Sequence, residues 1–433
     1  MVTACQSLDG LEVIFDDERA VANAGLVLPA TLAAHLGLET AANQLIKLPA
    51  GSGRHRPGRK AMTLIHSMIA GGDCIDDTDV LRAGQTESIL GHRVMAPSTC
   101  GTFLRSFTFG HLRQLDAWSE FALTAAWAAG AGPGDASMTI DIDSTICETH
   151  GYQKQGATFG YTKKRGYHPL LATRADTGEV LHVRFRKGSA NTGRGAERFV
   201  RETIGRIRRA GATGPLHLRA DSGFWSKKVI KACRDHGVTY SITVRQVSAV
   251  KKAIAATDET AWTPIDYTIG GDAEVAECPY GDGHRLVVRR TRIRGKQADL
   301  FANWRHHAFI TDTTATAVEA DADHRAHAVI ELAIRDLKEG AGLEHCPSGN
   351  FNANGAWTVL ATLAHNLLRW VHLIGGDTTG PIVAKTLRRK LLTVPGRLTR
   401  GGRRQQLRLP ARWPWATEFL ETLARLRAIP LRC

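Results

Sequence analysis

The sequence predicts a fold of the α+β or α/β class, in which a mixed β-sheet with helices packed on it is flanked by helical N- and C-terminal regions. Three observations lead to this prediction. Alanine- and leucine-rich segments fill the first part of the chain, strand-like alternation of apolar and polar residues begins near Ser137, and helical patterns return from about Ala320. Strand patterns interleaved with helical patterns are typical of a sheet covered by helices.

Residues 1–135 are predicted to be mainly helical. Their apolar segments, among them LVLPATLAAHLGL and LDAWSEFALTAAWAAG, are separated by turns that contain glycine or proline. The section from Leu26 to Ile46 fits a helix-turn-helix, and it fits an ordinary helical hairpin equally well, because no spacing in it is diagnostic. The sequence AGPGD, from Ala131 to Asp135, ends this region.

Residues 136–245 are predicted to form a sheet with two helices. Three strand candidates come first, and a helix, a strand, a helix and a strand follow. The segments are, in order, SMTIDIDSTI, YHPLLATRAD, EVLHVRFR, GAERFVRETIGRIRRAG, PLHLRADSGF, SKKVIKACRDHG and TYSITVR. This order suits a mixed sheet with packed helices, and it is the order expected of a ribonuclease-H-like core.

Residues 246–315 contain short strand-like segments and turns, and they are predicted to form a β-rich insertion. The segments are AWTPIDYTI, AEVAECPY, RLVVRRTRIRG and HHAFITD. Helical patterning resumes over residues 316–375, which we interpret as the second part of the core. Residues 376–433 form a basic C-terminal region that we expect to be helical.

The charge of the chain indicates an anionic partner. The formal net charge is +14 and the sequence pI is about 9.6, so the surface attracts polyanions at neutral pH. Nucleic acid is the commonest polyanion, although membrane-surface proteins and other arginine-rich proteins share this basicity. Charge alone therefore leaves the partner open.

The eight cysteines lie far apart without a CxxC pair, which disfavours a disulfide framework or a zinc knuckle. The first twenty residues lack the basic start and unbroken apolar stretch of a signal peptide. The most apolar later stretch is interrupted by His365, Asn366 and Arg369 before it reaches the roughly 20 residues that span a bilayer. We expect a soluble, cytoplasmic, nucleoid-associated protein with no membrane partner.

Three carboxylates have the placement that metal-dependent cleavage of a phosphodiester needs. Asp143 lies in the strand-like DIDST, Asp221 follows the strand that begins PLHL, and Glu331 lies in the predicted helix of HAVIELAIRDLKEG. Two divalent ions about 3.5 to 4 Å apart accelerate such cleavage, and Mg²⁺ prefers oxygen ligands. Each residue also has a structural interpretation, since Asp221 could cap a helix and Glu331 could be a solvated helical charge.

The blocks DIDST, RADSGF and ELAIRDLKEG, with the downstream NFNANGAWTVLATLAHNLLRW, resemble those of insertion-sequence transposases with a group 1 DDE domain. The resemblance runs from about Ser137 to the C-terminus. It implies that Asp143, Asp221 and Glu331 are the catalytic residues and bind two Mg²⁺ ions, with Mn²⁺ as a possible substitute. Asp141 is the rival for the first position, because it faces the same side of its strand as Asp143.

Many relatives carry a Tyr-x2-Arg-x3-Glu-x6-Lys signature around the glutamate. Lys338 has the expected spacing from Glu331, and it is predicted to contact DNA. The tyrosine and arginine positions are His324 and His327 instead, and Arg325 beside them is the nearest candidate for a DNA contact. A solvated surface lysine remains the alternative for Lys338.

A second basic element extends from Lys385 to Arg412 and contains no acidic residue. Such a stretch neutralises phosphates and releases counterions, so it is predicted to bind DNA without sequence preference. A solvated basic face is the alternative. The residues that we single out there are Arg388, Arg389, Lys390, Arg403 and Arg404.

The resemblance implies a DNA transposase that binds the terminal inverted repeats of its element, cuts a strand and joins the 3′-hydroxyl to target DNA. Double-stranded DNA would be its partner, as element ends and as target, and a homodimer would pair two ends. We therefore interpret residues 1–135 as a DNA-binding region. Two alternatives stay open, a metal-dependent nuclease that does not join DNA and a catalytically silent DNA-binding derivative.

Overall fold

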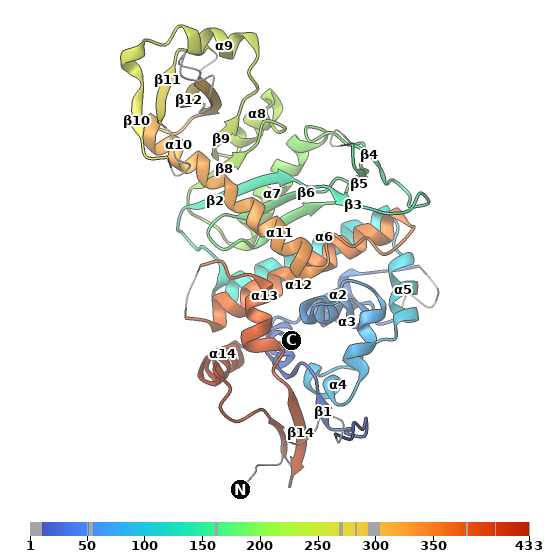
Figure 1. Cartoon of the computed structure of the whole chain (residues 1–433). Helices are drawn as coiled ribbons and strands as arrows, with labels where there is room; N and C mark the ends of the chain where they lie inside the picture. The colour runs from blue at the N-terminus through green and yellow to red at the C-terminus, as the bar shows by residue number, and fades with distance from the viewer. Residues whose placement is uncertain are drawn as a thin grey trace.

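The computed structural model describes residues 11–49, 51, 55–160, 163–267, 272–281, 284–292, 304–377, 380–402 and 404–432. In Figure 1 a β-rich part stands at the top, a large sheet lies in the middle, and helices from both ends of the chain lie below it. The prediction of a mixed α/β fold with a large mixed sheet is confirmed.

Most helices of the N-terminal region contact α12 (Phe351–Gly375). They are α1 (Val27–His35), α2 (Leu38–Leu45), α3 (Pro57–Ala70), α4 (Thr86–Leu90), α5 (Pro97–Arg105) and α6 (Phe109–Ala126). Helix α3 begins with a proline in its first turn and ends at Gly71, whose φ of +110° suits glycine. Helix α12 is buried on all sides between Ala353 and His372, which explains its apolar sequence.

The structure fits neither of the two interpretations left open for Leu26 to Ile46, the helix-turn-helix and the ordinary helical hairpin. Helices α1 and α2 are separated by Leu36 and Gly37, and the second helix turns by 54° from the first. A DNA-reading pair turns by about 90–120°. A change of direction of 54° is also too small for an antiparallel hairpin, and most of α1 is buried.

Among the described residues no single helix is both long and apolar enough to cross a bilayer, and the bent pair Ala24–His35 and Leu38–Leu45 passes that test when taken together.

The large sheet has the strand order β10-β11-β12-β13-β9-β8-β2-β6-β7 within the described chain. Its bounds are β2 (Met138–Ser144), β6 (Leu170–Arg174), β7 (Val180–Arg184), β8 (Leu216–Ala220), β9 (Thr239–Thr243), β10 (Thr263–Ile265), β11 (Ala273–Cys278), β12 (Arg285–Arg292) and β13 (Trp304–Thr311). Strands β2, β8 and β9 are parallel, and the other pairs are antiparallel. The β-rich segment continues this sheet, because Phe309 pairs with Thr243 of β9.

Helices follow several of these strands in the chain, and most of them contact the sheet. They are α7 (Ala196–Ala210), α8 (Lys227–Asp235), α9 (Ser248–Ala255), α10 (Ala317–Arg325) and α11 (Val329–Ala341), with a 3-10 turn, η6 (Ala326–Ala328), between the last two. In Figure 1 α10 and α11 follow one another along a diagonal across the sheet. A small sheet of β3 (Cys147–Glu148), β5 (Arg165–Tyr167) and β4 (Thr158–Phe159), which the sequence did not predict, follows β2.

The sequence led us to expect a helical C-terminal region. This expectation is wrong in part, because the region also contains two strands. After α13 (Ala384–Leu387) and a π-turn, η7 (Arg388–Leu392), the chain forms a hairpin of β14 (Gly396–Gly401) and β15 (Arg404–Arg408), and it ends in α14 (Ala416–Ala428). Strand β1 (Ala20–Val21) pairs with β14. Glycines disfavour a helix here, and at Gly396 a side chain would lie 2.7 Å from the Cβ of Ala24.

Candidate active site

Asp143 and Asp221 lie at the same edge of the sheet, at the ends of two neighbouring parallel strands. Ile142 of β2 pairs with Ala220 of β8, so the two aspartates are the next residues along their strands. Neighbouring strands are about 4.8 Å apart. The register therefore brings together two carboxylates that are separated in the sequence by α7 and by all the strands from β3 to β8.

Glu331 lies in the first turn of α11, which packs across β2. Burial, together with the negative charges of Asp221 and Glu331, raises the pKa of Asp143 to about 6, against the opposing effects of the Ser144 amide and His327. Burial also raises the pKa of Asp221, whose Oδ1 accepts a hydrogen bond of 3.0 Å from the Gly223 amide. The three predicted carboxylates therefore share one electrostatic environment, in which Glu331 is exposed.

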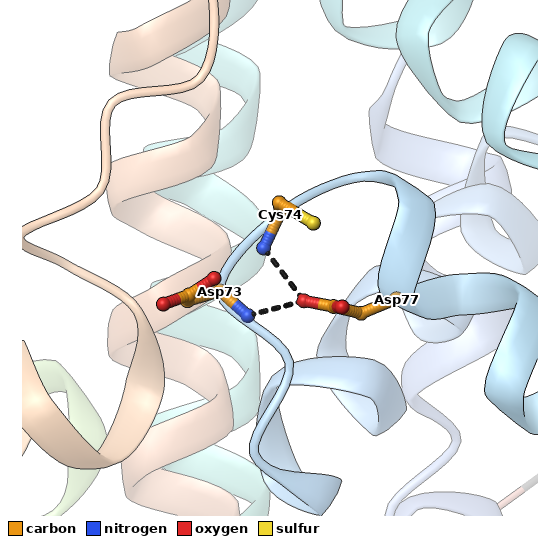
Figure 2. Close-up of side chains that lie close together, drawn as sticks. All are labelled: Asp73, Cys74 and Asp77. Carbon is orange, nitrogen blue, oxygen red and sulfur yellow. Dashed lines mark hydrogen bonds between the residues drawn. The ribbon is translucent and has the colours of Figure 1, made fainter.

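The ligand atoms of these three carboxylates lie farther apart than those of a second group, which contains Asp73, Cys74 and Asp77. Within the described ranges, Asp73, Cys74 and Asp77 offer ligand atoms that all lie within 4.8 Å of one another, and the three predicted residues do not meet that spacing. Figure 2 shows that the Asp77 carboxylate accepts the amide N–H groups of Asp73 and Cys74, at 2.8 and 2.9 Å. This group is therefore explained as a local turn before a 3-10 helix.

Asp141, the rival for the first carboxylate, has partners for both oxygens. Arg219 of β8 donates to Oδ1 at 2.7 Å and to Oδ2 at 2.9 Å, and His327 Nδ1 lies 3.0 Å from Oδ1. Asp141 and Arg219 are 0% and 3% exposed. This buried ion pair favours a structural role for Asp141 and leaves Asp143 at the open end of the strand.

The tyrosine and arginine positions of the family signature hold His324 and His327 in this chain. The first lies in the core, and the second lies at the candidate active site. His324 is buried against Phe309, and its ring nitrogens lie 2.5 Å from Ser241 Oγ and 2.9 Å from Thr243 Oγ1. His327 faces Asp141 beside the carboxylates. Of the signature positions that hold histidine here, only His327 reaches the site within the described structure.

The two predicted DNA contacts near Glu331 already have protein partners. Arg325 lies 2.9 Å from Asp321, one helical turn earlier. The Lys338 ammonium donates to the Ile146 carbonyl at 2.7 Å and lies 3.6 Å from Glu344. Lys338 therefore ties α11 to the chain just after β2, and its contact with DNA stays a prediction.

Arg388 is not a free DNA contact. Its guanidinium donates to the carbonyls of Ile69 and Met68, each at 2.7 Å, and to that of Gly340. It therefore joins the ends of α3 and α11, and the predicted role in DNA binding does not fit this position.

The other basic candidates are more accessible. Arg389 is exposed beside the ring of Trp415, Lys390 lies 3.3 Å from Glu418, and Arg404 begins β15 in an exposed position. Arg403 lies outside the described residues. Arg389 and Arg404 remain available to an external anion, whereas Lys390 is partly neutralised.

The sequence analysis missed two cations at the site. Arg219 was overlooked although it stands two residues before Asp221, where strand alternation gives both the same face. Arg245 follows β9, the third parallel strand, and its charge acts on Asp221. The signal for Arg245 was its place at the end of a predicted strand that neighbours the strand of Asp221.

The family model for the transposase DDE domain, group 1, matches residues 6–431 of the chain. No curated protein matches the sequence. Among solved structures, the cryo-EM structure of the piggyBac transposase synaptic complex with hairpin DNA is similar, with a TM-score of 0.47 and 12% sequence identity. That match covers 86% of this chain and 80% of the other. The family match spans nearly the whole sequence, and the chain belongs to the transposases with a group 1 DDE domain.

Proposed function

We propose that this chain is the active transposase of an insertion sequence, which cuts DNA at the ends of its element and joins the 3′-hydroxyl to a target. One observation carries the proposal. Asp143 and Asp221 end neighbouring parallel strands, and Glu331 acts electrostatically on Asp143 from the first turn of α11. A site of three carboxylates is of no use for DNA binding alone, since carboxylates repel phosphates, and it therefore favours catalysis over a silent binding protein.

The residues present fit a pair of divalent cations. Two ligand atoms of one Mg²⁺ lie at most about 4.2 Å apart, since each bond is about 2.1 Å. The three carboxylates do not offer ligand atoms that all lie within 4.8 Å of one another, so a single ion would not contact all three in this arrangement, whereas two ions about 3.5 to 4 Å apart would share them. The raised pKa values of the two aspartates come first from burial, to which the charges of Asp221 and Glu331 add at Asp143. Bound cations would stabilise the charged forms that burial disfavours.

Asp143, Asp221 and Glu331 would hold the ions, and the amides of Ser144 and Gly223 orient the two aspartates. When bound, Mg²⁺ or Mn²⁺ would supply Lewis acidity that activates the attacking oxygen and stabilises the leaving oxygen. The site is built from strand ends and one helix, so it holds the same geometry for water and for a 3′-hydroxyl as the attacking group. Cutting and joining would then be one in-line displacement used twice.

We also propose that the core is ribonuclease-H-like. The strand order β9-β8-β2-β6-β7 supports this, with β2 and β6 antiparallel and β2, β8 and β9 parallel. The first three core strands in the chain form an antiparallel unit, and the last two extend it on the other side of β2.

The C-terminal hairpin is the best candidate for non-specific DNA contact. Arg397 of β14 pairs directly with Arg408 of β15, and Arg404 lies on the same face opposite Gly401. All three arginines are exposed, and Leu398 and Leu407 lie on the other face, against the core. Arg397 lies 3.4 Å from Asp17, which partly neutralises it, whereas within the described chain no carboxylate forms an ion pair with Arg404 or Arg408. Like charges opposite one another are unfavourable, and a phosphate backbone would offset the repulsion that remains.

Replacing Arg397, Arg404 and Arg408 together by glutamine is expected to weaken DNA binding and its dependence on salt. If each contacts one phosphate, the slope of log K against log salt falls by about 2.7, because each neutralised phosphate contributes about 0.9. Titration of a duplex with the variant and the wild type at several salt concentrations measures the change. Glutamine at Arg82, Arg113 and Arg198, which are exposed elsewhere and ion-paired, is the matched control. An unchanged slope would remove the hairpin from the DNA interface.

An excision assay tests the proposed function. A marker flanked by the gene's own bordering DNA is supplied with the wild type or with Asp221→Ala, and loss and reinsertion of the marker are scored. We expect both events with the wild type and neither with Asp221→Ala. If the wild type binds these ends but does not cut them with Mg²⁺ or Mn²⁺, the silent derivative is correct. Cutting without reinsertion would indicate a nuclease. We also propose that a homodimer pairs the two ends, which the mass of the protein–DNA complex in solution would test.

A further inference from the structure

A basic cavity lies in the β-rich part of the sheet. It has a volume of about 260 Å³, and it is lined by Tyr267, Arg289, Thr291, Arg305, His306 and His307. The antiparallel register explains how it forms, since Arg289 pairs with His307 and Thr291 pairs with Arg305. Residues two apart share a face, so these four side chains stand on one face of β12 and β13. We call this cavity the arginine pocket.

The arginine pocket has an incompletely satisfied cation in its wall. Arg289 is 8% exposed, and its Nη1 donates to Asp321 at 2.8 Å, but its buried Nε has no hydrogen-bond acceptor among the described residues. A buried donor without a partner is unfavourable, because its interaction with water is lost and not replaced, and such groups are rare unless a ligand completes them.

The charge of the arginine pocket is positive. Asp321 is shared between Arg289 and Arg325, so one carboxylate faces two guanidinium groups. Arg305 is exposed, and within the described chain no carboxylate forms an ion pair with it. Burial and the charges of Arg289 and Arg305 lower the pKa of His307 to about 4, so this side chain is neutral at pH 7 and the arginines supply the charge.

A phosphate group is the anion that suits these side chains. Guanidinium groups bind phosphate oxygens through paired N–H donors. The Thr291 hydroxyl donates a long bond of 3.5 Å to the Arg305 carbonyl, and it can rotate to donate to a bound phosphate instead. The arginine pocket is large enough for a phosphate with part of an attached sugar. Tyr267 lies beneath Arg289, 5.3 Å from the guanidinium carbon, and its ring fixes that side chain in the wall.

The position of the arginine pocket relates it to the candidate active site. Asp321 lies in α10, and Glu331 lies ten positions later in α11, along the helical segment that crosses the sheet in Figure 1. Ten residues of helix span about 15 Å. One DNA strand advances by about 3.4 Å per nucleotide along the duplex axis, so this length corresponds to about four nucleotides when that axis runs parallel to α10 and α11.

We propose that the arginine pocket binds a backbone phosphate of the DNA strand that enters the active site, about four nucleotides from the bond that is cut. This inference rests on the proposed function, because it takes DNA as the source of the phosphate. Arg305 is the entry residue, and Arg289 and Thr291 receive the phosphate inside.

The test maps single phosphates by charge removal. Duplexes of the element end carry one uncharged methylphosphonate at a time, and their binding is measured with Mg²⁺ withheld. For the wild type we expect one or two adjacent positions at which the substitution weakens binding about fivefold to tenfold. In Arg305→Gln those positions should have lost their effect, because the contact is already gone. Arg292→Gln is the control, since Arg292 is exposed on the neighbouring strand β12, on the opposite face from Arg305, where it lies 3.4 Å from Asp272.

Three outcomes would overturn the proposal. The wild type and Arg305→Gln could show the same phosphate map, or the map could contain no sensitive position. In the third outcome, inorganic phosphate raises the Tm of the wild type but not that of Arg305→Gln, and the phosphate map shows no position that depends on Arg305. The arginine pocket would then bind free phosphate and not DNA. A map that depends on Arg305 in a protein that does not cut DNA supports the arginine pocket and refutes only the proposed catalysis.

Discussion

Replacing Asp143 by asparagine is expected to abolish DNA cleavage and, at pH 7, to stabilise the metal-free protein. The cleavage rate should fall by at least about 10³-fold, or about 4 kcal/mol in the activation free energy. Asparagine keeps the size of the side chain and an oxygen for the Ser144 amide, which lies 2.6 Å from Asp143 Oδ1. It lacks the charge that would hold a divalent ion, so the loss concerns chemistry and not folding.

The gain in stability follows from the sign of the pKa shift. In the folded protein the pKa of Asp143 is about 6, against 3.8 for the ordinary group. Between these values the folded state binds more protons than the unfolded state, so the free energy of unfolding falls as pH rises through this window. The contribution of Asp143 to the free energy of unfolding is fully present below pH 3.8 and is lost above pH 6. Asparagine does not titrate, so Asp143→Asn keeps its stability as the pH rises through this window. At pH 7 the free energy of unfolding of Asp143→Asn should exceed that of the wild type by at most about 3 kcal/mol.

Two measurements check this prediction. Strand cleavage is followed with Mg²⁺, and the Tm is measured with a chelator at pH 5 and at pH 7. We expect the Tm of Asp143→Asn to be higher than that of the wild type, and this difference should be larger at pH 7 than at pH 5. Asp176→Asn is the control, because Asp176 is an exposed carboxylate in an ion pair outside the site. Retained cleavage, or a Tm that falls at pH 7, would contradict the role given to Asp143.

Replacing Arg219 by methionine is expected to destabilise the whole core. Arg219 donates to both oxygens of Asp141, and the pair is almost fully buried. Removing one partner leaves an uncompensated buried charge, at a cost of about 3–5 kcal/mol. The His327 side chain also contacts Asp141, so the damage extends to the candidate active site.

A double substitution separates charge from packing. Adding Asp141→Leu to Arg219→Met removes both charges, and we expect it to restore much of the lost stability, since buried ion pairs are often replaceable by apolar residues. Unfolding by urea of the two single variants and the double variant measures the coupling. If the double variant is as unstable as the sum of the single variants, the two residues do not stabilise the protein as a pair.

The sequence by itself determined the strands and helices that have regular apolar periodicity. The segments of β2, β6, β7, β8 and β9, with α7 and α8 between them, lie where alternation and helical spacing placed them. Local patterns also located the aspartates of β2 and β8 at or just after the ends of strands. These features depend on neighbours within a few residues, so one sequence contains them.

Only the tertiary structure decided which residues share a surface. The register of β2 with β8 brings Asp143 beside Asp221 and buries Asp141 against Arg219, although both aspartates of β2 face the same side. The guanidinium of Arg388 is taken up by carbonyls that lie far away in the sequence.

The tertiary structure also decides that the basic C-terminal segment forms a hairpin. Strand β14 pairs with β1 from the other end of the chain, and that partner cannot be read from the basic segment itself. Charge composition predicted a basic surface, but a β-strand needs a partner to complete its hydrogen bonds, and a buried charge needs one of opposite sign. Both partners lie far away in the sequence, so the fold alone determines them.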